Sequence, residues 1–135
     1  MKKVLFICIK NTSRSPMAEA LAAMLAPGWE VYSAGMHPGK EPNPEAVRAM
    51  KELGCDISKH RPKHVSDFQK ITFDLVAKMD APDVSDFVTA KWIENWDVPD
   101  PANGGIEEFR KVRDMLAERV RKLAGGEQKG LSKAA

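Results

Sequence analysis

A cysteine and an arginine near the N-terminus have the spacing of a nucleophile and an anion-binding group. Cys8 and Arg14 are separated by five residues, and Ser15 follows directly. A short loop of this kind can turn several backbone N–H groups toward one point, and the guanidinium of Arg14 adds a planar fork of donors that matches two oxygens of a phosphate-like group. Such a positive cradle stabilises a thiolate, which is the nucleophilic form of Cys8.

The residues on either side of this loop predict the strand and the helix that would position it. Residues 4–7 form a continuous apolar run typical of a buried strand, and residues 16–25 are strong helix formers that begin with a proline. This arrangement places the loop at a helix N-terminus, where the helix dipole attracts an anion. The alternative is a small cysteine that only finishes a buried strand. The arginine at the start of the helix favours the functional interpretation.

Two further side chains of the loop suit an anion site. Ser15 is close enough in sequence to donate its hydroxyl to the sulfur of Cys8, and Asn11 is the loop residue that best tolerates a left-handed backbone. We therefore expect a substrate-binding loop made of Ile9, Lys10, Asn11, Thr12, Ser13, Arg14 and Ser15.

A second chemical signal lies far along the chain, where Asp100 stands between Pro99 and Pro101. The two proline rings stiffen the backbone, so that a carboxyl group can be held over a distant site at little entropic cost. A carboxylic acid above the cradle could protonate a leaving oxygen and later accept a proton from water. The alternatives are an ordinary turn aspartate and a competing role for Asp97. With the loop of Cys8 and Arg14 granted, we predict Asp100 as the general acid.

The loop and its continuation, Ser15-Pro16-Met17-Ala18-Glu19, resemble the phosphate loop of the low-molecular-weight protein tyrosine phosphatases. The thioredoxin-coupled arsenate reductases share the same fold, and the resemblance extends over nearly all of residues 1–124. It implies binding of phosphate, sulfate or arsenate and a general-acid loop at Asp100-Pro101. It also implies that Ser33 holds the loop through Asn11, whereas by residue type alone Ser33 is a solvated turn serine.

Several residues depart from one branch of this family or the other. His60, within Asp56-Ile57-Ser58-Lys59-His60-Arg61, resembles the phosphatase branch, where that histidine supports the loop. Residues 56–135 contain no cysteine, although the arsenate reductases carry resolving cysteines there. Cys55 could act as a resolving thiol, but packing inward is the favoured interpretation. Residues 102–105 lack the aromatic side chains that flank phosphotyrosine in the phosphatases.

Composition bounds the remaining possibilities. The chain has 135 residues, 43% of them hydrophobic, and a net charge of +2, which suits one domain and gives no support for nucleic-acid binding. Two distant cysteines form neither a disulfide framework nor a metal site, and the N-terminal apolar run is too short for a signal peptide or a membrane span. We expect a cytoplasmic protein with no metal and no cofactor.

The order of predicted elements indicates the fold class. Strands are expected near residues 4–7, 29–33, 73–77 and 92–98, helices near 16–25, 45–53 and 106–123, and a helix or loop at 83–89. This alternation predicts a single α/β domain at residues 1–124, with a four-stranded parallel sheet and helices on both faces. The site would lie at the carboxyl ends of the strands. Residues 125–135 are expected to be a flexible tail.

The favoured function is a phosphomonoester hydrolase of the protein tyrosine phosphatase type that acts through a phosphocysteine. Cys8 would attack, Arg14 and the loop amides would hold the phosphoryl oxygens, and Asp100 would protonate the leaving group. Its partner would be a phosphorylated protein or a small phosphomonoester. Two alternatives remain. One is an arsenate reductase that uses an external thiol, such as thioredoxin or glutathione, and the other is a non-catalytic module that binds phosphate or another oxyanion.

Overall fold

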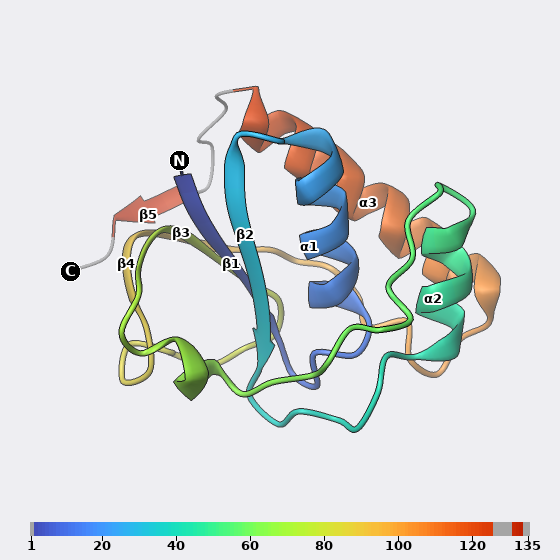
Figure 1. The fold of residues 1–135 in the computed structure, drawn as a ribbon, viewed down its shortest axis with the longest axis horizontal. Coiled ribbons are helices and arrows are strands. Elements are labelled where there is room, and N and C mark those ends of the chain that lie inside the picture. The colour runs from blue at the N-terminus through green and yellow to red at the C-terminus, as the bar shows by residue number, and fades with distance from the viewer. Residues whose placement is uncertain (1, 126–130, 134–135) are drawn as a thin grey trace.

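A computed structural model describes residues 2–125 and 131–133 and shows one α/β domain (Figure 1). The strands lie in the order β2-β1-β3-β4-β5, and the first four are parallel, while β5 runs antiparallel to β4. The strands are β1 (Lys2–Cys8), β2 (Trp29–Gly35), β3 (Thr72–Lys78), β4 (Thr89–Asn95) and β5 (Leu131–Lys133). The helices are α1 (Arg14–Leu25), α2 (Pro44–Lys51), α3 (Ile106–Ala124) and a 3-10 helix, η1 (Val65–Phe68).

The alternation of side chains along β1 divides the core into two layers. Val4, Phe6 and Cys8 point to one face and pack with residues of all three α-helices. Leu5 and Ile7 point to the other face, where η1 and the segment that follows β3 cover them. Figure 1 shows α1, α2 and α3 together on the same side of the sheet. The second face, which was also predicted to carry helices, is therefore covered by the 3-10 helix η1 and by loops.

The four-stranded parallel sheet and the α/β class predicted from the sequence are confirmed. The observed α1 begins at Arg14, two residues before the proline expected to open it, and β4 covers Thr89–Asn95 instead of residues 92–98. His64 is half-buried, and its ring accepts a hydrogen bond from the backbone N–H of Ser66 at the start of η1. Residue propensities do not reveal this capping role, because it depends on the direction of the His64 ring.

One segment of the predicted flexible tail is a β-strand in the structure. Residues 131–133 form β5 and pair with β4 through the partners Trp92 and Lys133, Ile93 and Ser132, and Glu94 and Leu131. The rest of the predicted tail beyond Gly125 lies outside the described residues. A short strand added to the edge of a sheet satisfies backbone groups that would otherwise be unpaired. The hydropathy pattern of three residues is too short to indicate this.

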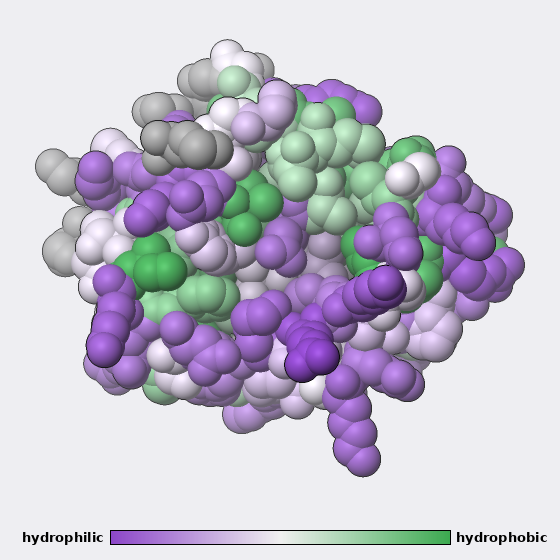
Figure 2. Space-filling view, in the orientation of Figure 1, coloured by the Kyte–Doolittle hydropathy of each residue, from purple (hydrophilic) through white to green (hydrophobic). Residues whose placement is uncertain are grey.

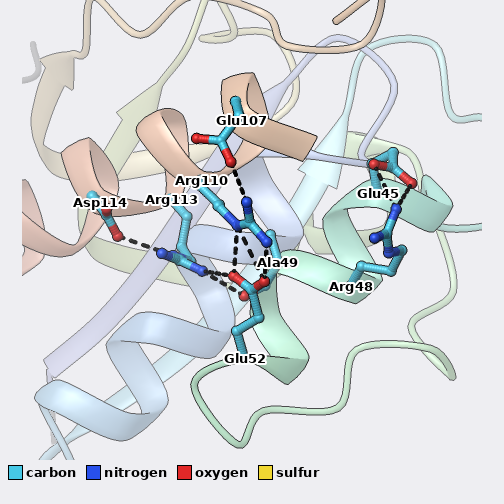
Figure 3. A network of polar contacts seen from close by, with 8 residues as sticks. All are labelled: Glu45, Arg48, Ala49, Glu52, Glu107, Arg110, Arg113 and Asp114. Atoms are coloured by element: carbon cyan, nitrogen blue, oxygen red, sulfur yellow. Dashed lines mark hydrogen bonds and ion pairs between the residues drawn. The ribbon is translucent and has the colours of Figure 1, made fainter. Parts of the chain in front are cut away.

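Ion pairs tie the end of α2 to α3 (Figure 3). The Glu52 carboxylate accepts hydrogen bonds from Arg110, at 2.6 Å from its Nη2, and from Nη1 of Arg113 at 2.8 Å. Arg113 is nearly buried and also donates to the carbonyl of Ala49 at 2.8 Å. These contacts join residues about sixty positions apart and hold α2 against α3 beside the shared core.

The surface is mostly hydrophilic on the face drawn in Figure 2, with hydrophobic residues in small separate patches. Over the described residues, no helix combines the length and the apolar character needed to cross a bilayer. The exposed large hydrophobic side chains of the described residues are Met24, Leu53, Trp92 and Met115.

Candidate active site

The loop between β1 and α1 is held from outside through its carbonyl groups. The segment after β2 lies along the loop and donates backbone N–H groups to it. The pairs are Met36 to Cys8 at 3.2 Å, His37 to Ile9 at 2.7 Å, Gly39 to Lys10 at 3.0 Å and Asn43 to Thr12 at 2.9 Å. With its carbonyls engaged on the outside, the loop can direct its N–H groups inward, which is the arrangement of an anion-binding nest.

Gly35, the last residue of β2, permits this close approach. A Cβ atom at Gly35 would lie 2.7 Å from the carbonyl oxygen of Ile9 and 2.9 Å from the backbone nitrogen of Asn11. Both distances are shorter than van der Waals contact, and backbone atoms on each side leave no room to adjust. The absence of a side chain at Gly35 therefore lets β2 and the loop lie side by side.

Asn11 is the central side chain of the loop. Its φ of 57° lies in the left-handed region, as its residue type predicted. The fully buried amide donates from Nδ2 to Ser15 Oγ at 2.8 Å and to Ser33 Oγ at 3.0 Å. Its Oδ1 accepts from the backbone N–H of Lys63 at 3.1 Å. Asn11 thus connects the loop to α1, to β2 and to the segment before η1.

His60 lies against the outside of the loop. Its Nε2 is 3.1 Å from both the carbonyl oxygen and Oδ1 of Asn11, so this nitrogen carries the proton. Burial, with the nearby charge of Lys63, lowers the pKa of His60 to about 4, so the ring is neutral at pH 7. His60 Nδ1 lies 3.7 Å from Glu19 Oε1, but a neutral ring forms no salt bridge there. His60 does not line the pocket at Cys8.

Glu19 extends the same network toward β2. Ser33 donates to Glu19 Oε1 at 2.8 Å and accepts from Asn11, so its hydroxyl links the two side chains. Burial raises the pKa of Glu19 above its usual value. The predicted pairing of Ser33 with Asn11 is present in the structure, and the carboxyl group of Glu19 is an additional partner that the sequence did not indicate.

Cys8 lies at the bottom of a small pocket at the carboxyl end of β1. Its Sγ is 2.9 Å from Ser15 Oγ, and the residue is only 3% exposed. The pocket is lined by Cys8, Lys10, Thr12, Ser13, Arg14, Asp100 and Ala102. Three side chains predicted for chemistry, Cys8, Arg14 and Asp100, therefore meet in one pocket.

Arg14 is positioned by three acceptors from distant parts of the chain. Its Nη1 donates to Asp80 Oδ2 at 2.6 Å and to the carbonyl of Val98 at 3.0 Å, and its Nη2 lies 3.6 Å from Asp100 Oδ2. Asp80 follows β3 with a left-handed φ of 58°. Asp80 was not among the site residues predicted from the sequence. The sequence did contain a signal for it. Asp80 is a carboxylate that closely follows a strand, and the carboxyl ends of parallel strands meet at the same edge of the sheet, where Cys8 also lies.

The two aspartates that competed for the general-acid role lie in different places. Asp100 lines the pocket of Cys8, and its Oδ1 also accepts from the backbone N–H of Ala102 at 3.1 Å. Asp97 lines a separate hollow beside α3, together with Met115, Glu118 and Arg119. The geometry therefore favours Asp100 over Asp97.

Cys55 is remote from Cys8. Its sulfur lies 3.7 Å from the sulfur of Met24, near the end of α1, whereas Cys8 contacts Ser15 at the start of α1. Ser15 and Met24 are nine positions apart on the helix, which corresponds to about 13.5 Å along its axis. An attack by Cys55 on an adduct of Cys8 would require a large rearrangement. No cluster of three or more His, Cys, Asp or Glu side chains in the described part of the chain is suited to hold a metal ion.

Comparison with known proteins adds four findings. Residues 3–134 match the model of the family described as low molecular weight phosphotyrosine protein phosphatase. The chain is 35% identical to a glutaredoxin arsenate reductase of Synechocystis sp., over 91% of this chain and 96% of that protein. It is 38% identical to an arsenate reductase of Staphylococcus aureus, over 85% of this chain and 90% of that protein. A solved structure of an arsenate reductase in the phosphate binding state superposes with a TM-score of 0.84 at 34% identity. The superposition covers 93% of this chain and 98% of that one.

These relatives overturn the favoured functional prediction. From the sequence, a phosphomonoester hydrolase was predicted first and arsenate reduction second, but proteins similar over most of the chain are arsenate reductases. The prediction of a phosphatase is therefore wrong. It relied on the missing cysteines after residue 55 and on His60, yet neither feature concerns the binding or the attack of the oxyanion.

Proposed function

Because this chain belongs to the low molecular weight phosphotyrosine protein phosphatase family, we propose that it uses the family's cysteine loop to reduce arsenate with electrons from an external thiol. The observation that carries this proposal is the pocket in which Cys8, Arg14 and Asp100 meet, in a chain whose similar relatives are arsenate reductases. Arsenate has the tetrahedral shape and the charge that such a pocket binds.

The loop supplies the binding. Arg14 and the inward N–H groups of residues 9–15 hold the arsenate oxygens, and the N-terminus of α1 adds its dipole. Asp80 and the carbonyl of Val98 fix Nη1 of Arg14, which leaves Nη2 and its side of the guanidinium directed toward Asp100. The donors are therefore in place before the anion arrives, so little reorganisation is needed during the reaction.

The first step forms a covalent adduct. The Cys8 sulfur attacks arsenic, an As–S bond forms, and one As–O bond breaks. The departing oxygen leaves as water after it takes a proton from Asp100. Ser15 donates its hydroxyl to the sulfur and so eases the later departure of that sulfur. The arsenic is still pentavalent at this point.

The second step transfers the electrons. An external thiolate attacks the Cys8 sulfur, an S–S bond forms, and the As–S bond breaks with its electron pair left on arsenic, which departs as trivalent arsenite. A second external thiol then attacks the mixed disulfide and releases the Cys8 thiolate. In total one arsenate and two thiols give arsenite, a disulfide and water. Cys55 is the only other cysteine of the chain and lies far from Cys8, so the thiols come from outside.

The test compares the wild type with Cys8→Ser and Cys55→Ser. Arsenate-dependent oxidation of thiol is measured with glutathione, with glutathione plus a glutaredoxin, and with a thioredoxin, and arsenite is quantified directly. We expect Cys8→Ser to lose all activity and Cys55→Ser to keep it. Absence of arsenite with every donor would overturn the proposal, and tight binding of arsenate in that case would favour the non-catalytic module. If Cys55→Ser loses activity, the proposal that the reducing thiols come from outside the chain would be overturned.

A further inference from the structure

Ser13 has a hydroxyl group that the protein itself does not use. It occupies the position before α1, where a serine side chain ordinarily accepts a hydrogen bond from a backbone N–H of the first turn. Its backbone angles, φ −132° and ψ −79°, differ from those of a usual cap, and its side chain makes no capping hydrogen bond. The residue most suited to cap α1 therefore directs its hydroxyl elsewhere.

The hydroxyl of Ser13 is also buried without a partner. The residue is 5% exposed, and its Oγ is one of two buried side-chain polar atoms that lack a hydrogen-bond partner within the described residues. The other is Trp96 Nε1, which belongs to the core beneath α3. Burying a hydroxyl without a partner is unfavourable, so such a group at a pocket wall is suited to pair with a ligand that binds in the pocket.

The position of Ser13 identifies what that ligand must be. Ser13 lines the same pocket as Cys8, Arg14 and Asp100. The sulfur of Cys8 already pairs with Ser15 at 2.9 Å, and Ser13 makes no hydrogen bond to it. The two serines that flank Arg14 thus differ, because Ser15 contacts the nucleophile whereas Ser13 lines the pocket and its hydroxyl contacts no protein group.

We propose that the side-chain hydroxyl of Ser13 donates a hydrogen bond to an oxygen of the bound tetrahedral anion, in addition to the backbone N–H groups of the loop. Ser13 is then a substrate-binding residue through its side chain. The inference rests on the anion pocket of the proposed function and is independent of the electron transfer. A hydroxyl at this position also leaves Cys8 without a neighbouring loop thiol with which it could form a disulfide.

The experiment measures anion affinity in Ser13→Ala, with Ser13→Thr as the variant that keeps the hydroxyl. Dissociation constants for inorganic phosphate and for arsenate are determined by calorimetry at pH 7.5, and thermal midpoints are recorded without any anion. A hydrogen bond to a charged group corresponds to a loss of roughly tenfold to a hundredfold in affinity. We expect that loss in Ser13→Ala and an affinity near the wild type in Ser13→Thr.

The thermal midpoint separates this role from a structural one. Because the empty pocket leaves the hydroxyl unpaired, Ser13→Ala without anion should unfold at the same temperature as the wild type or higher. An affinity within twofold of the wild type, or a midpoint clearly lower without anion, would overturn the inference. Phosphate binding requires no reduction, so a wild type that binds phosphate but produces no arsenite would overturn the proposed function and leave this inference standing.

Discussion

Asn11 illustrates how a single residue can determine the shape of the loop. It combines a left-handed backbone with four polar contacts, to Ser15, Ser33, His60 and the backbone of Lys63. The left-handed backbone and the side-chain contacts contribute separately to the shape of the loop. Glycine can adopt the same backbone conformation, but it has no side chain that could make these contacts.

Substitution of Asn11 can separate these two contributions. Asn11→Ala removes the amide and keeps the left-handed strain, and we expect a loss of about 2–4 kcal/mol in the free energy of unfolding. Asn11→Gly removes the amide but relieves the strain, so it should be about 1 kcal/mol more stable than the alanine variant. Urea denaturation of both proteins measures the difference. Equal stabilities would contradict a strained loop at this position.

The neutral state of His60 predicts a pH dependence of stability. Burial and the charge of Lys63 lower the pKa of His60 from 6.5 to about 4. Between those two values the unfolded chain binds a proton that the folded protein does not. The free energy of unfolding therefore falls as the pH falls from about 6.5 to 4. Above about pH 6.5, His60 causes no further change in stability.

The matched variant is His60→Gln, whose amide can still donate to Asn11 but does not titrate. We expect the wild type to lose more stability than His60→Gln between pH 6.5 and pH 4, as measured by urea denaturation at several pH values. A ring whose NMR signals titrate near pH 6.5 would contradict the neutral, buried His60 described above.

At the scale of elements, the site depends on how closely β2 approaches the loop. The N–H groups of residues 36–43 hold the loop carbonyls, and Gly35 allows the strand to come near enough for this to happen. The loop is therefore a joint product of the β1–α1 unit and the segment after β2. Neither would have this shape alone.

Gly35→Ala tests this dependence directly. The added Cβ would contact Ile9 and Asn11 at less than 3.0 Å, so the loop must move away from β2. We expect a loss of about 1–3 kcal/mol in stability, as is typical of overpacking, and a strong loss of phosphate binding. Gly28→Ala is the control, because a Cβ there meets nothing within 4 Å and φ is not left-handed. Equal phosphate affinity in Gly35→Ala and Gly28→Ala would refute the close-approach argument.

At the scale of the whole molecule, α2 and α3 are joined by charge as well as by the core. Hydrogen bonds from Arg110 and Arg113 lower the pKa of Glu52 from 4.5 to about 2 (Figure 3). Since the pKa is lower in the folded state, the contribution of Glu52 to stability is complete above about pH 4.5 and is lost as pH falls toward 2. Glu52 and Arg110 are both more than a third exposed, so salt should weaken the attraction between them.

Glu52→Gln should therefore lower the thermal midpoint slightly at pH 7 and low ionic strength. The difference from the wild type should shrink at 1 M salt and vanish near pH 2. Glu45→Gln is the control, because Glu45 pairs only with Arg48 on the same helix at 2.9 Å and joins no two elements. A larger effect of Glu45→Gln than of Glu52→Gln would show that the link between helices contributes nothing.

The sequence by itself determined the parts of this protein that depend on neighbouring residues. The strand, loop and helix around Cys8 and Arg14 follow from a contiguous stretch, and so does the left-handed Asn11. The four parallel strands follow from the alternation of elements. These features are readable because hydrogen bonding and side-chain direction within an element are fixed by spacing along the chain.

Only the tertiary structure decided which distant side chains meet. Asp80 reaches Arg14 across 66 positions, His60 reaches Asn11 across 49, and Asp100 lines the pocket while Asp97 does not. The unused hydroxyl of Ser13 is visible only once every possible partner has been placed around it. The physical reason is that such contacts depend on the packing of several elements against one sheet, and the residue types alone do not specify that packing.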